Sequence, residues 1–105
     1  MNSKSITGTM KEFIQGVVKL IVDKPDEIKV EVSNTTKSIL IQISAAKEDI
    51  GKIIGKNGRT IDCLKLLSLV VKNTQFLGDT KEVFVEIIED EKSNFLKRNK
   101  NIDWL

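Results

Sequence analysis

Histidine and tyrosine are absent from this sequence of 105 residues, and cysteine and proline each occur once. Without histidine, neither a Ser-His-Asp triad nor a Cys-His pair can form. A lone cysteine leaves no zinc site of the usual Cys/His kind, and the carboxylates mostly stand beside lysines or in the acidic run Glu86–Glu91. We therefore expect a protein that is not an enzyme, with no catalytic residues, no cofactor, no metal and no small-molecule substrate.

Long apolar runs are also missing, since none approaches the roughly 20 residues of a membrane-spanning helix. The first ten residues lack the apolar core of a secretory signal, and a single cysteine cannot form an internal disulfide. These absences favour a cytoplasmic protein with no membrane partner. Large apolar residues are abundant: Leu, Ile, Val and Phe make up 36 of the 105 residues. This number is enough to form the hydrophobic core of one folded domain.

The first half of the chain predicts a helix followed by a hairpin. Apolar residues recur every three or four positions over residues 10–21, which is typical of an amphipathic helix. Thr9 and Glu12 have the spacing of a capping box at its start. Alternation of apolar and polar residues over 28–32 and again over 39–43 predicts two strands, and the short polar turn between them makes the pair antiparallel.

The second half predicts two helices and a last strand. A short helix precedes the Gly55–Gly58 segment, a second one covers residues 59–71, and residues 83–88 are rich in β-branched and aromatic residues, as strands are. Because the second helix is apolar nearly all round, we expect it to be well buried, with Cys63 as a small apolar residue. Its expected inner face consists of Ile61, Leu64, Leu67 and Val70 or Val71.

The order helix, strand, strand, helix, helix, strand predicts an α+β fold. A right-handed crossover through two helices places the last strand parallel to the second. The result is a three-stranded mixed sheet covered on one face by three helices. We expect one domain over residues 10–89, a flexible leader over residues 1–9 and a charged tail over residues 90–105.

The Gly55–Gly58 segment has the features of a phosphate-binding loop. Glycine at both ends lets the backbone turn sharply and approach a ligand closely. The following helix directs its free N–H groups and the positive end of its dipole at the loop. Residues 52–72 hold five basic residues and one acidic residue, a local charge of +4 against +2 for the whole chain.

Other interpretations of these glycines fit less well. A Walker-type loop needs four residues between its glycines and then Lys-Ser/Thr, whereas Gly51 and Gly55 enclose three residues and Lys56 precedes Asn57. A membrane helix-packing motif needs a longer apolar segment. An ordinary helix–helix turn with a glycine C-cap remains the simple alternative.

Two segments together resemble one protein family. Residues 50–61, IGKIIGKNGRTI, resemble the core signature of KH domains, whose GXXG loop clamps about four backbone nucleotides. The order of elements resembles the type II KH fold. Residues 22–30, VDKPDEIKV, resemble the segment before the first strand in the bacterial KhpA family of single-KH RNA-binding proteins. The resemblance covers about residues 10–88.

The resemblance implies a cytoplasmic single-stranded RNA-binding protein, an RNA chaperone or post-transcriptional regulator linked to cell shape and cell-wall growth. It also implies a KH-containing partner similar to KhpB. Because one KH surface grips only about four nucleotides, and linked sites gain by effective concentration, we expect a homodimer or a heterodimer with that partner. A KH fold that serves mainly as a protein–protein interaction module is the alternative.

By this resemblance the RNA backbone lies against the glycine loop, and its bases rest on an aliphatic floor from Ile54, Ile61 and Ile43. We expect no aromatic stacking, because no Phe or Trp lies near the loop in the sequence. About four phosphate contacts predict a slope near −3 for log affinity against log salt. The expected RNA-binding residues are Lys52, Ile54, Gly55, Lys56, Asn57, Gly58, Arg59, Ile61 and Lys65.

Overall fold

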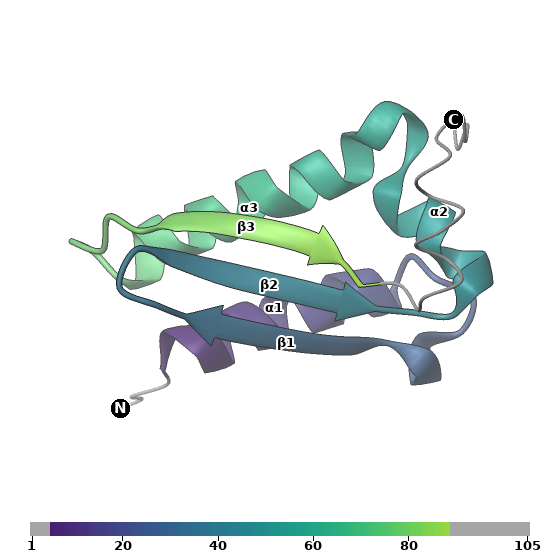
Figure 1. Ribbon diagram of the computed structural model, residues 1–105, viewed down its shortest axis with the longest axis horizontal. Helices are drawn as coiled ribbons and strands as arrows, with labels where there is room; N and C mark the ends of the chain where they lie inside the picture. The colour runs from purple at the N-terminus through teal and green to yellow at the C-terminus, as the bar shows by residue number, and fades with distance from the viewer. Residues whose placement is uncertain (1–4, 89–105) are drawn as a thin grey trace.

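The computed structural model describes residues 5–88 (Figure 1). Its helices are α1 (Ile6–Lys19), α2 (Ile50–Ile54) and α3 (Arg59–Gln75), and its strands are β1 (Lys29–Asn34), β2 (Ser38–Ser44) and β3 (Glu82–Ile87). Short 3-10 turns cover Pro25–Glu27, Lys47–Asp49 and Lys56–Gly58. The predicted order of elements is confirmed. Residues 1–4 and 89–105, which include the whole of the expected tail, lie outside the described residues.

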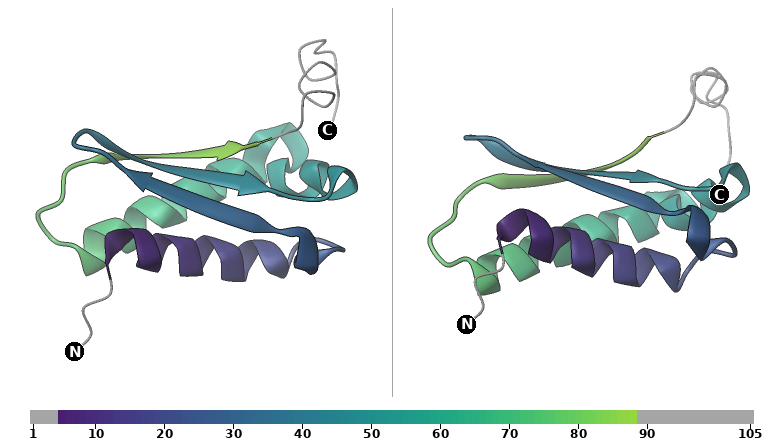
Figure 2. Two further views of the ribbon diagram at one scale, coloured as in Figure 1. Left: turned by 60° about the horizontal axis from the view of Figure 1, so that its bottom comes forward. Right: turned by 90° about the horizontal axis from the view of Figure 1, so that it is seen from below.

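The three strands form one sheet in the order β1-β2-β3. Strands β1 and β2 are antiparallel, with Val30 opposite Ile43, and β2 and β3 are parallel, with Ile41 opposite Val85. The helices of residues 5–88 all lie on one face of the sheet, and no helix of this part of the chain lies on the other face (Figure 2). This is the predicted α+β arrangement of a type II KH fold, with β3 as an edge strand.

The core lies between the sheet and the helices, and strand alternation decides which side chains enter it. Residues of β2 alternate between buried and half-buried along the whole strand. Helix α1 contributes three fully buried residues, Met10, Ile14 and Val18, at four-residue spacing on the apolar face that its periodicity predicts. The buried cluster consists of Met10, Ile14, Val18, Ile28, Val30, Ile39, Ile41, Ile43, Ile53, Leu64, Val83 and Val85.

Helix α1 begins one turn earlier than its capping box predicts. Ser5 is the N-cap, and its hydroxyl accepts a hydrogen bond from the N–H of Gly8 at 3.1 Å. The choice of Thr9 was therefore wrong, because serine caps a helix as well as threonine does. The additional turn brings Ile6 against the core, and residues 6–9, expected in the leader, belong to the helix.

The inner face of α3 also differs from the prediction. Leu64, Ser68 and Lys72 are buried, one helical turn apart, whereas Leu67 is 46% exposed and Cys63 is exposed. The prediction ranked positions by hydrophobicity and so passed over the two polar residues. The hydroxyl of Ser68 has no hydrogen-bond partner among the described residues. The leucine-rich side of α3 therefore faces outward.

Lys72 is buried because its ammonium group is satisfied by the backbone of the α3–β3 connection. Its Nζ donates to the carbonyl oxygens of Asp79 and Lys81, each at 2.8 Å, and lies 3.5 Å from the Asp79 carboxylate. A buried cation is tolerated when it is paired and hydrogen-bonded in this way. The lysine thus fastens the end of α3 to the start of β3.

No helix among residues 5–88 has the length and apolar character needed to cross a membrane.

Candidate nucleic-acid interface

The loop between α2 and α3 is a tight turn with three residues in the left-handed region. Gly55 has φ +80°, Asn57 +58° and Gly58 +72°. The N–H of Gly55 donates to the Gly51 carbonyl at 2.8 Å, and the N–H of Gly58 to the Gly55 carbonyl at 3.1 Å. Asparagine is among the few residues other than glycine that adopt this region readily. Lys56 and Asn57 are exposed at the tip.

The two glycines are required for different reasons. A Cβ on Gly55 would collide with the Thr60 side chain and lie 2.7 Å from its backbone nitrogen, whereas a Cβ on Gly58 would meet nothing within 4 Å. Gly55 therefore allows the loop to pack against the first turn of α3. At position 58, glycine is needed only because the backbone has a positive φ angle there.

The N-terminus of α3 opens directly onto this loop. Gly58 is its N-cap residue, and no side chain caps the helix. Uncapped N–H groups and the positive end of the dipole make such an end favourable for an anion. A phosphate placed at the loop would face both.

Three of the expected cations are free to meet such an anion. Lys56, Arg59 and Lys65 are exposed, and no salt bridge within residues 5–88 involves them. All three lie in the loop or in the first two turns of α3. The positive charge available to a ligand is concentrated there.

The other two cations of the cluster are already engaged. Lys52 lies 3.1 Å from Oδ2 of Asp23 and 3.8 Å from Oδ1 of Asp49, and Lys72 is 2% exposed. The local charge of +4 in the sequence therefore overstates the charge open to a ligand. The carboxylates that engage these two lysines, those of Asp23, Asp49 and Asp79, all lie outside residues 52–72 and so are missing from that count.

Asp49 holds α2 to the segment that follows α1. Its buried carboxylate accepts the N–H of Asp23 at 3.1 Å and that of Lys24 at 2.9 Å. Burial alone would raise the pKa of Asp49, but the two backbone hydrogen bonds and the nearby Lys52 together hold its pKa below the ordinary value. The ionised carboxylate anchors the base of the glycine loop.

The expected aliphatic floor is only partly present. Ile54 and Ile61 are half-buried beside the loop, so part of each side chain can meet a ligand. Ile43 is 0% exposed and belongs to the core cluster, because it lies on the central strand and points toward the helices. Its assignment to the floor was wrong.

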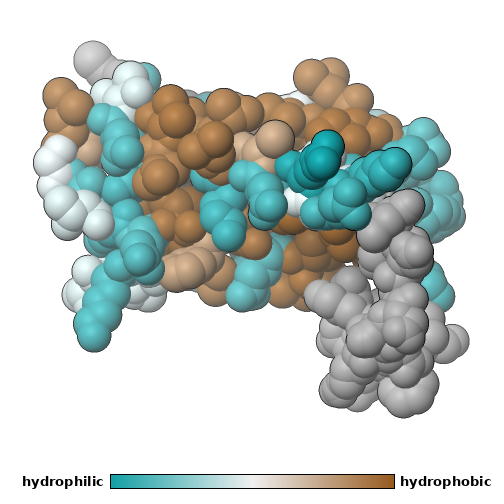
Figure 3. Space-filling view, turned by 90° about the horizontal axis from the view of Figure 1, so that it is seen from above, coloured by the Kyte–Doolittle hydropathy of each residue, from teal (hydrophilic) through white to brown (hydrophobic). Residues whose placement is uncertain are grey.

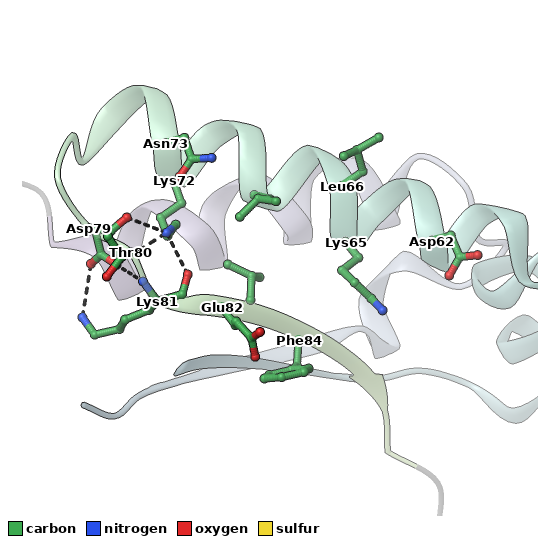
Figure 4. Close-up of a pocket in the computed structure, with 12 residues that line it drawn as sticks. Asp62, Lys65, Leu66, Lys72, Asn73, Asp79, Thr80, Lys81, Glu82 and Phe84 are labelled. Atoms are coloured by element: carbon green, nitrogen blue, oxygen red, sulfur yellow. Dashed lines mark hydrogen bonds and ion pairs between the residues drawn. The ribbon is translucent and has the colours of Figure 1, made fainter. Parts of the chain in front are cut away.

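A groove between α3 and β3 extends the site away from the loop (Figure 4). It has a volume of about 690 Å³, within the range of ligand sites. Figure 3, which views the molecule from above Figure 1, shows apolar side chains gathered on this side with polar groups between them. Its lining includes Asp62, Lys65, Leu66, Leu69 and Asn73 from α3, and Glu82, Val83 and Phe84 from β3.

One end of the groove is closed by the Lys72 contacts. Asp79 accepts the backbone N–H of Lys81 at 2.9 Å and pairs with its ammonium group at 3.1 Å. That backbone hydrogen bond is the main cause that lowers the pKa of Asp79, against the effect of burial. The α3–β3 connection is thereby fixed as a wall.

Sequence reasoning missed the groove entirely. The expected inner face of the second helix does not include Leu66, and Phe84 lies in the last predicted strand, far from the loop in the sequence. One feature of the sequence could have indicated the groove: the helix after the glycine loop has more leucines than a single buried helix face can hold. Among the described residues, no cluster of three or more cysteine or carboxylate side chains could hold a metal ion.

Comparison with known proteins finds one matching protein family and several similar proteins. The family described as KhpA/KhpB, KH domain, matches residues 11–87. The chain is 42% identical over 81 residues to the RNA-binding protein KhpA of Chlamydia trachomatis, covering 77% of this chain and 99% of the relative. It is 38% identical over 79 residues to the RNA-binding protein KhpA of Clostridium acetobutylicum, covering 75% of this chain and 100% of the relative.

One solved structure has a similar fold. A crystal structure of Era from Aquifex aeolicus bound to GDP and an aluminium fluoride superposes with a TM-score of 0.56 at 16% identity. The match covers 78% of this chain and 31% of the Era chain. At this level of identity the likeness shows the fold alone.

Proposed function

The chain belongs to the KhpA/KhpB KH-domain family, and from this premise we propose that it binds single-stranded RNA by clamping the backbone at the Gly55–Gly58 loop. The observation that carries the proposal is the uncapped N-terminus of α3 beneath two glycines of positive φ, with three free cations beside it. Relatives that match over nearly their whole length are named RNA-binding proteins. The proposed role is binding, without a catalytic step.

In the proposed mode, a phosphate lies against the loop and the strand continues along the groove between α3 and β3. Lys56 and Arg59 flank the phosphate, and Lys65 neutralises the next part of the backbone. The bases then face the half-buried side chains of Ile54 and Ile61 and the apolar wall of the groove. Lys52 orders the base of the loop through its carboxylate partners.

The wider role in this proposal is that of a cytoplasmic RNA chaperone or post-transcriptional regulator. A single clamp of about four nucleotides binds weakly and with little sequence discrimination, which suits a protein that binds and releases many RNAs. The link to cell shape and cell-wall growth, with a KhpB-like partner, is supported by the family resemblance.

Salt dependence tests the clamp directly. With three free cations rather than four or five, we expect log affinity for a short single-stranded RNA to fall with log salt at a slope near −2, since each contact on a single strand contributes about 0.7. Fluorescence anisotropy of a labelled oligonucleotide at several salt concentrations measures it. Lys56→Gln should make the slope shallower by about 0.7.

The matched control is Lys37→Gln, which removes an exposed cation from the β1–β2 turn, at the other end of the sheet from the glycine loop (Figure 1). This variant should keep the parent slope. A parent slope near zero, or an equal change in both variants, would contradict the clamp and favour a protein-interaction module.

The outward side of α3 supports the expected pairing with a second KH domain. Cys63, Leu67 and Val70 form an exposed stripe there, on the side of α3 away from its buried positions and outside the groove lining. We propose that a second copy of this chain, or a KhpB-like KH domain, covers this α3 stripe. Two KH surfaces on one RNA would gain affinity through effective concentration.

Replacing Leu67 by Asp should therefore convert a dimer to a monomer, because a carboxylate in an apolar interface loses its hydration without a partner. Light scattering at increasing protein concentration measures the change. Leu77→Asp is the control, since Leu77 is almost fully exposed and lies outside the α3 stripe. A wild-type chain that stays monomeric at high concentration, with no KH partner in pull-downs, would remove the pairing.

A further inference from the structure

The sheet face that is turned away from the helices, here called the open face, carries an apolar patch. Strand alternation places Leu40 of β2 and Phe84 of β3 on this face, where they are direct neighbours in the β2–β3 register. Figure 4 shows the Phe84 ring on the side of β3 turned away from α3. Phe84 is 43% exposed, and Ile88, just after the strand, is 40% exposed. Within residues 5–88 no helix covers this patch (Figure 2).

Carboxylates surround the patch on the same face. Glu31 of β1 and Glu82 and Glu86 of β3 are exposed at positions that alternate with inward-facing residues. No salt bridge within residues 5–88 involves these three glutamates. Lys29 is the one basic residue that the three strands place on this face, so three glutamates and one lysine give it a net charge of −2. Such a face repels both RNA phosphates and a second copy of itself.

The sequence that follows β3 has the complementary character. Residues 92–105, KSNFLKRNKNIDWL, contain four basic residues and one acidic residue, a net charge of +3. The match to the KH-domain family ends at residue 87, so this segment is additional to the matched domain. Its large apolar residues are Phe95, Leu96, Ile102, Trp104 and Leu105.

The segment starts close enough to the patch to reach it. Phe84 precedes Ile88 by four residues, which is about 13 Å along a strand. With residues 89–91 as a turn, residues 92–105 span about 46 Å if they are extended and about 21 Å if they are helical. Either conformation returns the chain to the level of Phe84. Because the segment is tethered to the sheet, its effective concentration at the patch is high without any other molecule.

We propose that residues 92–105 dock on the open face of their own chain, with the Trp104 indole packed against Leu40 and Phe84. The basic side chains of the segment then lie beside the three glutamates of the face. Trp104 is the anchor because an indole buries a large apolar area and pairs favourably with another aromatic ring. Docking of this kind is independent of the proposed RNA clamp, and it keeps the basic side chains of the segment away from the RNA.

Fluorescence of the full chain reports the docking, because Trp104 is its only tryptophan and tyrosine is absent. An indole packed against apolar side chains emits at shorter wavelength than one in water, and acrylamide quenches it less. Phe84→Asp should move the emission to longer wavelength and raise the quenching, since a carboxylate in an apolar contact loses its hydration. Leu20→Asp places the same charge at an exposed leucine after α1 and should keep the wild-type emission.

A second variant leaves the apolar patch intact. Glu31→Lys combined with Glu86→Lys changes the charge of the open face from −2 to +2, as two exposed carboxylates become two cations. This variant should release Trp104 as Phe84→Asp does. Asp26→Lys with Glu27→Lys reverses two exposed carboxylates between α1 and β1 and should keep the wild-type emission. Circular dichroism that matches the wild type in each variant shows that a longer wavelength reports release of the segment, not unfolding.

The opposite results identify other occupants. Wild-type emission and quenching in both open-face variants overturn the docking, and emission that changes with protein concentration shows that the segment binds a second copy instead. Lys97→Gln with Arg98→Gln and Lys100→Gln should move the emission to longer wavelength and leave the RNA salt slope unchanged. A slope that becomes shallower by about 2, the sum of three contacts, shows that the segment binds RNA and overturns the docking. Failure of the wild type to bind RNA removes the clamp and leaves the fluorescence test intact.

Discussion

Replacing Lys56 and Asn57 together by Asp, with both glycines kept, should lower RNA affinity at least about tenfold, a loss of roughly 1.4 kcal/mol or more. The change removes one positive charge and adds two negative charges where the phosphate must lie, so the local charge over residues 52–72 falls from +4 to +1. The new carboxylates repel the phosphate and oppose the helix N-terminus. Anisotropy titration measures the loss.

The fold should hardly respond to this double substitution. Both residues are exposed, and exposed substitutions usually change stability by no more than about 0.5 kcal/mol. Aspartate also tolerates the left-handed backbone that Asn57 adopts. Circular dichroism and thermal melting should match the parent, and Lys37→Asp at the far turn should affect neither property. Normal melting with parent-like RNA binding would show that the loop is not the clamp.

Alanine substitutions at the two loop glycines should differ strongly in their cost. Gly58→Ala should destabilise the fold by about 1–2 kcal/mol, the cost of a side chain at positive φ. Gly55→Ala carries the same cost and adds a collision with Thr60 that includes the backbone nitrogen at 2.7 Å. Because that atom belongs to the first turn of α3, relief requires the helix to move. We expect a total of at least about 3 kcal/mol for Gly55→Ala, by analogy with overpacked sites.

Urea denaturation measures these differences, with Gly16→Ala as the matched control. Gly16 lies inside α1, and a Cβ there would meet nothing within 4 Å. Alanine is the better helix former by about 1 kcal/mol, so this third variant should be more stable than the parent. Equal destabilisation by Gly55→Ala and Gly58→Ala would mean that the loop does not pack against α3 as described.

Periodicity and turn chemistry were sufficient to predict the architecture. The stripe of α1, the alternating strands and the crossover each depend on local spacing, and one-sided burial then fixes the topology. The glycine loop could also be predicted, because Gly55, Gly58 and the residues around them are neighbours in the sequence. Its role in RNA binding remains a prediction.

The parts that could not be predicted depend on contacts between distant segments. Lys52 has a partner in Asp23, 29 positions away, so the sequence cannot show that its charge is engaged. Lys72 is buried only because the α3–β3 connection supplies carbonyl groups to it. Hydrophobicity alone would place leucines, not Ser68 and Lys72, on the inner face of α3. The groove exists only once β3 lies beside α3, and no local pattern reports that.

The parallel pairing of β2 with β3 has a consequence for the order in which the molecule assembles. Partners in the β1–β2 hairpin are as close in the chain as Asn34 and Ile39, whereas Ser38 meets Glu82 only after the whole two-helix crossover. Closing the longer loop costs more entropy before any contact repays it. We therefore expect the hairpin to form early and β3 to join last. Since β3 is one wall of the groove, a chain can hold most of its core before this groove exists.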